Sequence, residues 1–82
     1  MSNSIEEKVI KIITEVMGFK PGDVKASSTK SDLGMDSLDD VECVMAIEEE
    51  FDVELPDSAI SELYMVSDIA NFVMEKIKEG VE

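Results

Sequence analysis

The stretch DLGMDSLDDVE, residues 32–42, is the passage from a loop into a helix around which the rest of the chain is arranged. Gly34 lets the loop turn, because glycine adopts backbone conformations that other residues avoid. Asp36 has the short carboxylate typical of an N-cap, which accepts a hydrogen bond from a free N–H of the first turn. Asp39 and Asp40 place negative charge at the positive end of the helix dipole. Ser37 is therefore predicted at the first helical position with its hydroxyl outward, beside amides that suit a phosphate.

The helix that begins at Ser37 is predicted to run to Phe51 and to carry two apolar stripes. The stripe expected to face the core consists of Cys43, Val44, Ile47 and Phe51. The other stripe consists of Leu38, Val41 and Met45, with Glu42, Glu48 and Glu49 beside it. A helix needs one stripe to dock on its own domain, so the second indicates a surface for a partner protein. The alternative is a helix packed on both sides.

The flanking segments predict three more helices. Residues 4–17 repeat isoleucine and valine at helical spacing and end before Gly18. A long connection then runs from 19 to 35, with Val24 and Leu33 as its expected anchors in the core. A helix of one or two turns is expected from Asp57, and a last one from about 66 to 78. We therefore expect an all-α, single domain over 1–82, a four-helix bundle of three longer helices and one short one.

Charge is distributed unevenly along the 82 residues, whose net charge is −13. Thirteen of the twenty acidic residues lie between 31 and 74, a segment without lysine or arginine. Such a surface repels nucleic acid and anionic membrane, and it attracts a basic patch on another protein. No apolar run approaches the roughly 18 residues of a membrane span. We expect a monomer in the cytoplasm.

Several kinds of catalytic and metal site are excluded by composition. The chain has no histidine, so it can form neither a Ser-His-Asp nor a Cys-His arrangement, nor a zinc site of Cys and His. It also lacks a glycine-rich phosphate loop. Cys43 is the single cysteine and lies on the inward stripe, where a structural thiol is expected. We therefore predict no enzyme activity and no dedicated metal site.

The block of residues 32–56 closely resembles the acyl carrier proteins of type II fatty acid synthesis, with its motifs in the same order and at the same spacing. The likeness rests on DSL at 36–38, preceded by DLG at 32–34 and followed by the acidic helix up to Phe51. It extends to MGF at 17–19, VELPD at 53–57 and VSDI at 66–69. The chain departs from that family at Thr29-Lys30, where an apolar or aromatic residue is common, and at Cys43, where leucine is usual.

The resemblance implies that Ser37 carries 4′-phosphopantetheine, transferred from coenzyme A by a phosphopantetheinyl transferase (a carrier protein synthase). The terminal thiol of this arm would hold acyl groups as thioesters for the enzymes of fatty acid and lipid synthesis. Basic patches on these partners would recognise a face of eight residues. That face consists of Asp36, Leu38, Asp39, Val41, Glu42, Met45, Glu48 and Glu49.

The family also shelters the acyl chain inside the bundle. The residues expected to line this pocket are Cys43, Ile47, Phe51, Leu55, Ile60, Leu63, Ile69 and Phe72. Two alternatives stay open at this point. One is a carrier for a specialised route, such as polyketide, aminoacyl or other lipid synthesis. The other is a small acidic helical module that binds a protein or divalent cations, in which Ser37 would serve merely as an N-cap.

Overall fold

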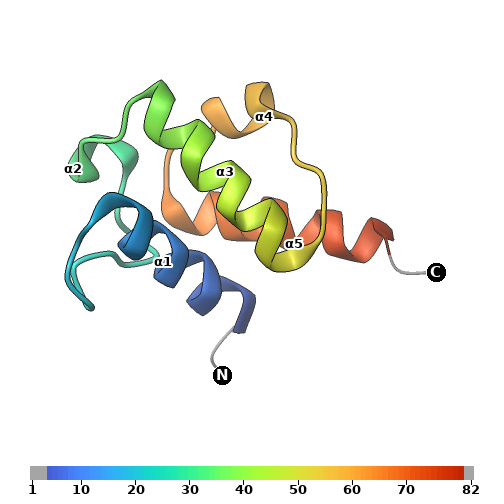
Figure 1. Ribbon diagram of the computed structural model, residues 1–82, viewed down its shortest axis with the longest axis horizontal. Coiled ribbons are helices and arrows are strands. Elements are labelled where there is room, and N and C mark those ends of the chain that lie inside the picture. Colours follow the sequence, from blue (N-terminus) through green and yellow to red (C-terminus); the bar gives the residue numbers. More distant parts are fainter. Residues whose placement is uncertain (1–3, 81–82) are drawn as a thin grey trace.

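Five helices make up most of the computed structural model, which describes residues 4–80 (Figure 1). They are α1 (Ser4–Met17), α2 (Lys30–Leu33), α3 (Ser37–Phe51), α4 (Asp57–Ser61) and α5 (Val66–Gly80). The predicted all-α class is confirmed, and so are the bounds of the first helix and of the helix that begins at Ser37. α1 packs against both α3 and α5, and α4 lies beside the first half of α3.

The core lies where the long helices meet and consists of aliphatic side chains. Val9 and Ile13 of α1 are fully buried, as the spacing of the apolar residues predicts. Val44 and Ile47 of α3 and Val66, Ile69, Ala70 and Val73 of α5 meet them there. The expected anchors Val24 and Leu33 are buried as well, and so is Leu55 in the link before α4.

α1 ends at Gly18 for a stereochemical reason. Gly18 has a φ of 76°, in the left-handed region that favours glycine. Its amide donates to the Glu15 carbonyl, and the next amide, that of Phe19, donates to the Thr14 carbonyl at 2.9 Å. This pair of bonds is the Schellman arrangement that closes helix C-termini.

The connection between α1 and α3 contains a helical turn that the sequence reasoning missed. α2 spans four residues, too few to show an apolar repeat of helical period. Its two ends carry the signals instead: the Thr29 hydroxyl accepts from the Asp32 amide at 3.0 Å, and Gly34 closes the turn at a φ of 68°. The bundle therefore has five helices rather than four, and the long loop is not structureless.

The same connection is fixed to the segment before α5. The Lys30 amide donates to the Tyr64 carbonyl, and the Val66 amide donates to the Ser28 carbonyl, each at 3.0 Å. These bonds form an antiparallel bridge between Thr29 and Met65. Because the loop is held on this side, Gly34 and the residues after it enter α3 from a fixed position.

Candidate functional site

Ser37 is the first residue of α3, and a reciprocal pair of hydrogen bonds holds the turn that presents it. The Asp39 amide donates to Asp36 Oδ1 at 3.0 Å, and the Asp36 amide donates to Asp39 Oδ2 at 3.1 Å. This is a capping box with aspartate at both positions. The predicted N-cap at Asp36 is therefore confirmed. The Ser37 side chain is exposed on this turn.

The helix start offers less to a free phosphate than the sequence suggested. The Asp39 amide is already bonded to Asp36, and the Asp40 amide donates to the Asp36 carbonyl at 3.0 Å. Of the first-turn amides, those of Ser37 and Leu38 have no hydrogen-bond acceptor in the described chain and remain open to a ligand. Two carboxylates beside them also repel an anion. The geometry suits a phosphate bonded covalently to the hydroxyl, since such a bond does not need the helix end for affinity.

A cleft of ≈ 180 Å³ opens beside Ser37, between α3 and α4. Its lining consists of Ser37, Asp40, Val41, Val44, Ser58 and Ser61. The four residues from α3 follow the i, i+3, i+4, i+7 spacing of one helix face. The volume is below the roughly 300 Å³ at which pockets for whole small molecules begin. The cleft therefore fits a segment of an extended chain that starts at the serine.

Asp40, a lining residue of this cleft, belongs to a buried ion pair that the sequence did not reveal. Lys30 Nζ lies 3.1 Å from Asp40 Oδ2 and 2.6 Å from the Ile60 carbonyl oxygen. The two side chains are 11% and 14% exposed, respectively. The pair thus ties α2, α3 and the end of α4 together. Asp40 Oδ1 is also buried, and it has no hydrogen-bond partner in the described chain.

The residues predicted to line an acyl pocket lie in the core and not on the cleft. Five are buried: Cys43, Ile47, Leu55, Ile60 and Ile69. Three pack against them at the edge of the core: Phe51, Leu63 and Phe72. They already contact one another, so an acyl chain reaches them only when the helices separate. Their role as a pocket stays a prediction. The sequence reasoning missed Ser58, Ser61 and Val44 as cleft residues, although the helical spacing from Ser37 pointed to Val44.

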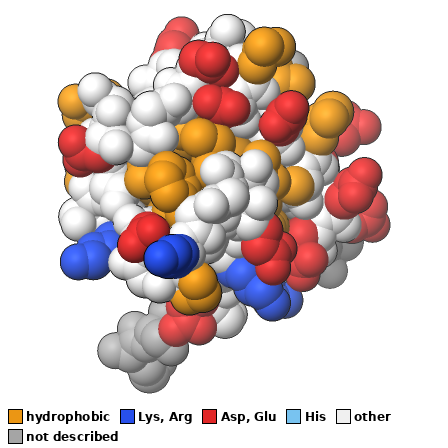
Figure 2. Space-filling view, turned by 60° about the vertical axis from the view of Figure 1, so that its left-hand side comes forward, with side chains coloured by type: hydrophobic (Ala, Val, Ile, Leu, Met, Phe, Trp, Pro, Cys, Tyr) orange, Lys and Arg blue, Asp and Glu red, His pale blue; other side chains and the backbone are white. Residues whose placement is uncertain are grey.

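The second apolar stripe of α3 is exposed, as expected. Leu38, Val41 and Met45 are 73%, 37% and 54% exposed. Packing of this helix on both sides is therefore wrong. Figure 2 shows acidic and apolar side chains on the upper part of the molecule, where α3 begins, with basic ones lower down. Asp36, Glu42 and Glu49 are exposed, and Asp39 is half-buried.

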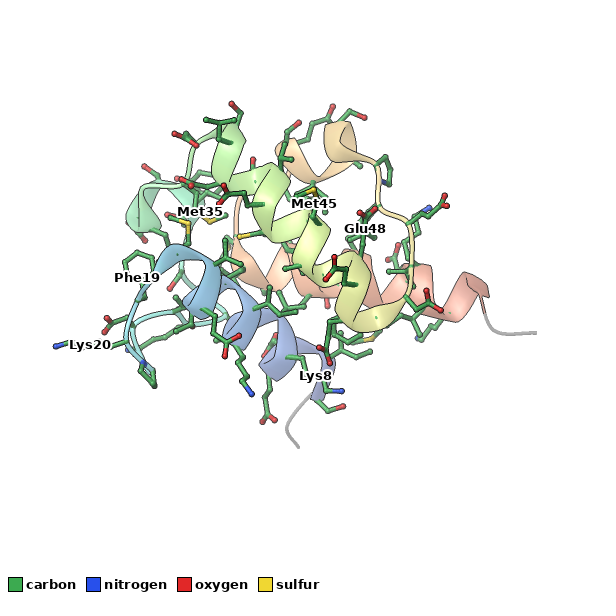
Figure 3. The ribbon with its side chains drawn as sticks, viewed as in Figure 1. Lys8, Phe19, Lys20, Met35, Met45 and Glu48 are labelled. Atoms are coloured by element: carbon green, nitrogen blue, oxygen red, sulfur yellow. The ribbon has the colours of Figure 1, made fainter. Side chains whose placement is uncertain are left out.

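Glu48 differs from the other acids of the predicted recognition face. It is half-buried, and its Oε2 accepts from the Leu55 amide at 2.8 Å. In Figure 3 its side chain lies on the side of α3 that faces the link to α4. The bond holds that link, which carries no side-chain cap at α4. Glu48 is therefore a structural residue of the fold, whatever it adds to the surface charge.

Cys43 is buried at 3% exposure, as predicted for a structural thiol. The pKa of this thiol is raised to about 12, mainly by burial and also by the carboxylates of Asp40, Asp39 and Glu42, while Lys30 opposes them. The thiolate is the reactive form, so the folded chain keeps Cys43 unreactive at neutral pH.

Across 4–80 no three acidic or cysteine side chains converge as a metal ion would require. In the same part of the chain, no helix has the length and apolar character to cross a membrane.

Comparison with known proteins identifies the class of this site. A family model described as a phosphopantetheine attachment site matches residues 7–73. The crystal structure of an acyl carrier protein from Thermotoga maritima is 33% identical, with a TM-score of 0.79 over 93% of this chain and 89% of that one. The chain belongs to the acyl carrier protein family, whose phosphopantetheine is bound covalently to a serine. Members of this family are carriers and not catalysts.

Proposed function

We propose that the chain is a single carrier domain that bears 4′-phosphopantetheine on Ser37 and carries acyl groups as thioesters for fatty acid synthesis. The thiol of the arm supplies the thioester chemistry, and the protein supplies position. One observation carries the assignment to Ser37: an exposed hydroxyl stands on a capped helix start, at the mouth of a cleft, within the matched region. The capping box keeps that hydroxyl in place for an incoming transferase.

The surface around Ser37 supports protein partners with basic patches. Leu38, Val41 and Met45 offer apolar contact area, and the exposed carboxylates attract basic groups at long range. We infer that the phosphopantetheinyl transferase and the acyl-handling enzymes dock there, one after another. The acidic surface disfavours nucleic acid. A free, buried Cys43 suits the reducing cytoplasm, where we place the protein.

A second candidate is a carrier for a specialised route, of polyketide, aminoacyl or other lipid type. The observation that favours it is the departure from the family pattern at Thr29-Lys30, where a lysine paired with Asp40 stands in place of the usual apolar or aromatic residue. Both candidates share the arm on Ser37.

Loading of the native chain tests the proposed function by mass and by thiol count. Incubation with coenzyme A and a phosphopantetheinyl transferase is expected to add one arm per chain. Because Cys43 is buried with a raised pKa, the folded apo chain should react slowly with a maleimide. The loaded chain should take one label when folded and two when unfolded. Absence of any mass gain with several transferases would contradict the proposal.

Reversal of one surface charge is expected to slow docking. Glu42→Lys should lower the association rate with the transferase roughly three- to tenfold at low salt. This is part of the rate enhancement that a whole charged surface gives by electrostatic steering. The difference should fade near 1 M salt, where charges are screened within about 3 Å. Surface plasmon resonance over a salt series measures both effects.

Glu15→Lys on α1 is the matched control, because it makes the same charge change at another exposed position. Equal slowing by both variants would mean that total charge matters and the α3 face does not. Glu48→Lys is unsuitable, since it also breaks the bond to the Leu55 amide.

A further inference from the structure

α4 is tied to α3 at both of its ends. It is five residues long and its N-terminus has no side-chain cap, so its position depends on the contacts that it makes with the rest of the bundle. In the link before it, the Leu55 amide donates to Glu48 of α3 at 2.8 Å. Near its far end, the Ile60 carbonyl accepts from Lys30 Nζ at 2.6 Å, and the same ammonium lies 3.1 Å from Asp40 Oδ2 on α3. These two ties fix how far α4 stands from α3.

The tie made by Lys30 lies next to Ser37. Asp40 follows Ser37 by three positions on α3, and both residues line the cleft. The lysine and aspartate side chains are 11% and 14% exposed, so water screens their attraction little. Movement of α4 away from α3 would pull the ammonium from the Ile60 carbonyl or from the carboxylate, and either leaves a buried charge less well compensated. We call this arrangement of Lys30, Asp40 and the Ile60 carbonyl the Lys30 clamp.

The cleft that the clamp borders has room for a short apolar chain. Its surface is mainly apolar, and Val41 and Val44 are part of it. An aliphatic cargo gains from burial there, whereas the amides of an arm would lose their hydrogen bonds to water. Since a methylene fills about as much space as a water molecule, roughly 30 Å³, the ≈ 180 Å³ of the cleft holds a chain of about six carbons.

A longer chain has no free space to enter. Val44 belongs both to the cleft and to the core cluster, in which Ile47 and Ile60 are 1% and 2% exposed. These side chains already fill the region between α3 and α4, and protein cores tolerate added volume poorly. Further methylenes therefore fit only if α4 moves outward, and the Lys30 clamp opposes that movement.

We propose that Lys30 is a specificity-determining residue: its clamp keeps α4 on α3, so that the carrier shelters acyl groups of up to about six carbons and leaves the ends of longer ones in solvent. The inference rests on the carrier function proposed above, and it adds the class of cargo.

The test loads butyryl, hexanoyl and dodecanoyl groups onto the chain, confirms each by mass, and measures melting by circular dichroism. The clamp is removed in K30M/D40L, where apolar residues replace the buried pair, a change that is often neutral or stabilising. It is also removed in K30M/D40N, where asparagine keeps the size of the aspartate in the cleft lining. K8M/E50L is the matched control, because it removes an exposed ion pair of the same charges, 3.7 Å apart, between α1 and α3.

In the wild type, the melting temperature should rise from butyryl to hexanoyl by about 2–3 °C per methylene, the effect of burying roughly half of each group. The dodecanoyl form should melt no higher than the hexanoyl form, and K8M/E50L should behave in the same way. In both clamp variants the rise should continue to dodecanoyl. A general loss of stability shifts all three acyl forms of one protein alike, so these differences report on the cargo and not on the fold.

The place of the chain end is measured separately, by NMR of dodecanoyl forms with a ¹³C-labelled terminal methyl group. In the wild type this methyl should give no nuclear Overhauser effect to Ile47 or Ile60. In the clamp variants it should contact them.

Melting temperatures that keep rising to dodecanoyl in the wild type, or a plateau at hexanoyl in the clamp variants as well, would overturn the inference and leave the carrier function intact. Contact of the wild-type dodecanoyl methyl with Ile60 would overturn it too, whether or not a clamp variant folds. A native chain whose mass shows no arm contradicts both proposals, so the mass measurement distinguishes the two failures.

Discussion

Lys30→Met is expected to lower the free energy of unfolding by about 3–5 kcal/mol, the usual cost of leaving one partner of a buried ion pair alone. Asp40 would lose the ammonium of Lys30 as its partner while its side chain is still largely buried. The Ile60 carbonyl would lose the ammonium but keep the Leu63 amide as a donor. Small domains are stable by about 5–15 kcal/mol, so this single change should remove a large share of the total.

Urea unfolding followed by circular dichroism measures the loss, with Lys8→Met as the control. Lys8 pairs with Glu50 at 3.7 Å, and the two side chains are 57% and 47% exposed. Such exposed pairs contribute at most about 1 kcal/mol, so the control should change little. Both variants raise the net negative charge equally. Equal losses would show that the Lys30 pair has no special energetic role.

Local signals in the sequence predicted most of the helical frame. Gly18 and Asp36 mark helix boundaries by backbone conformation or capping, and each is determined by neighbours in the chain. The apolar spacing of α1 and α3 likewise predicted which faces are buried. The exposure of Leu38 and Met45 followed from the same reasoning, because one stripe is enough to dock a helix.

Features that depend on distant residues could not be predicted in this way. α2 is too short for a periodic pattern, and its fixation depends on a hydrogen bond from the Lys30 amide to the distant Tyr64 carbonyl. Lys30 seemed an ordinary loop lysine, and its burial requires Asp40 and the Ile60 carbonyl to meet in space. The cleft lining likewise depends on where α4 packs. Glu48 shows the same limit, since its bond to the Leu55 amide spans seven residues and a change of direction.

Ser37→Ala is expected to abolish loading completely while leaving the fold unchanged. The hydroxyl is the proposed point of attachment, and alanine has no oxygen to replace it. Ser37 is exposed, and the capping box beside it is made by Asp36 and Asp39, so stability should change by no more than about 0.5 kcal/mol. Ser58→Ala is the matched control, because Ser58 is an exposed serine that lines the same cleft.

The intact mass of these three chains after incubation with coenzyme A and a phosphopantetheinyl transferase tests the central claim most directly. The wild type and Ser58→Ala should each gain the mass of one arm, and fragmentation should localise it to Ser37. The Ser37→Ala chain should keep its original mass. A gain of one arm by a folded Ser37→Ala chain would contradict the assignment, because it would place the attachment on another residue.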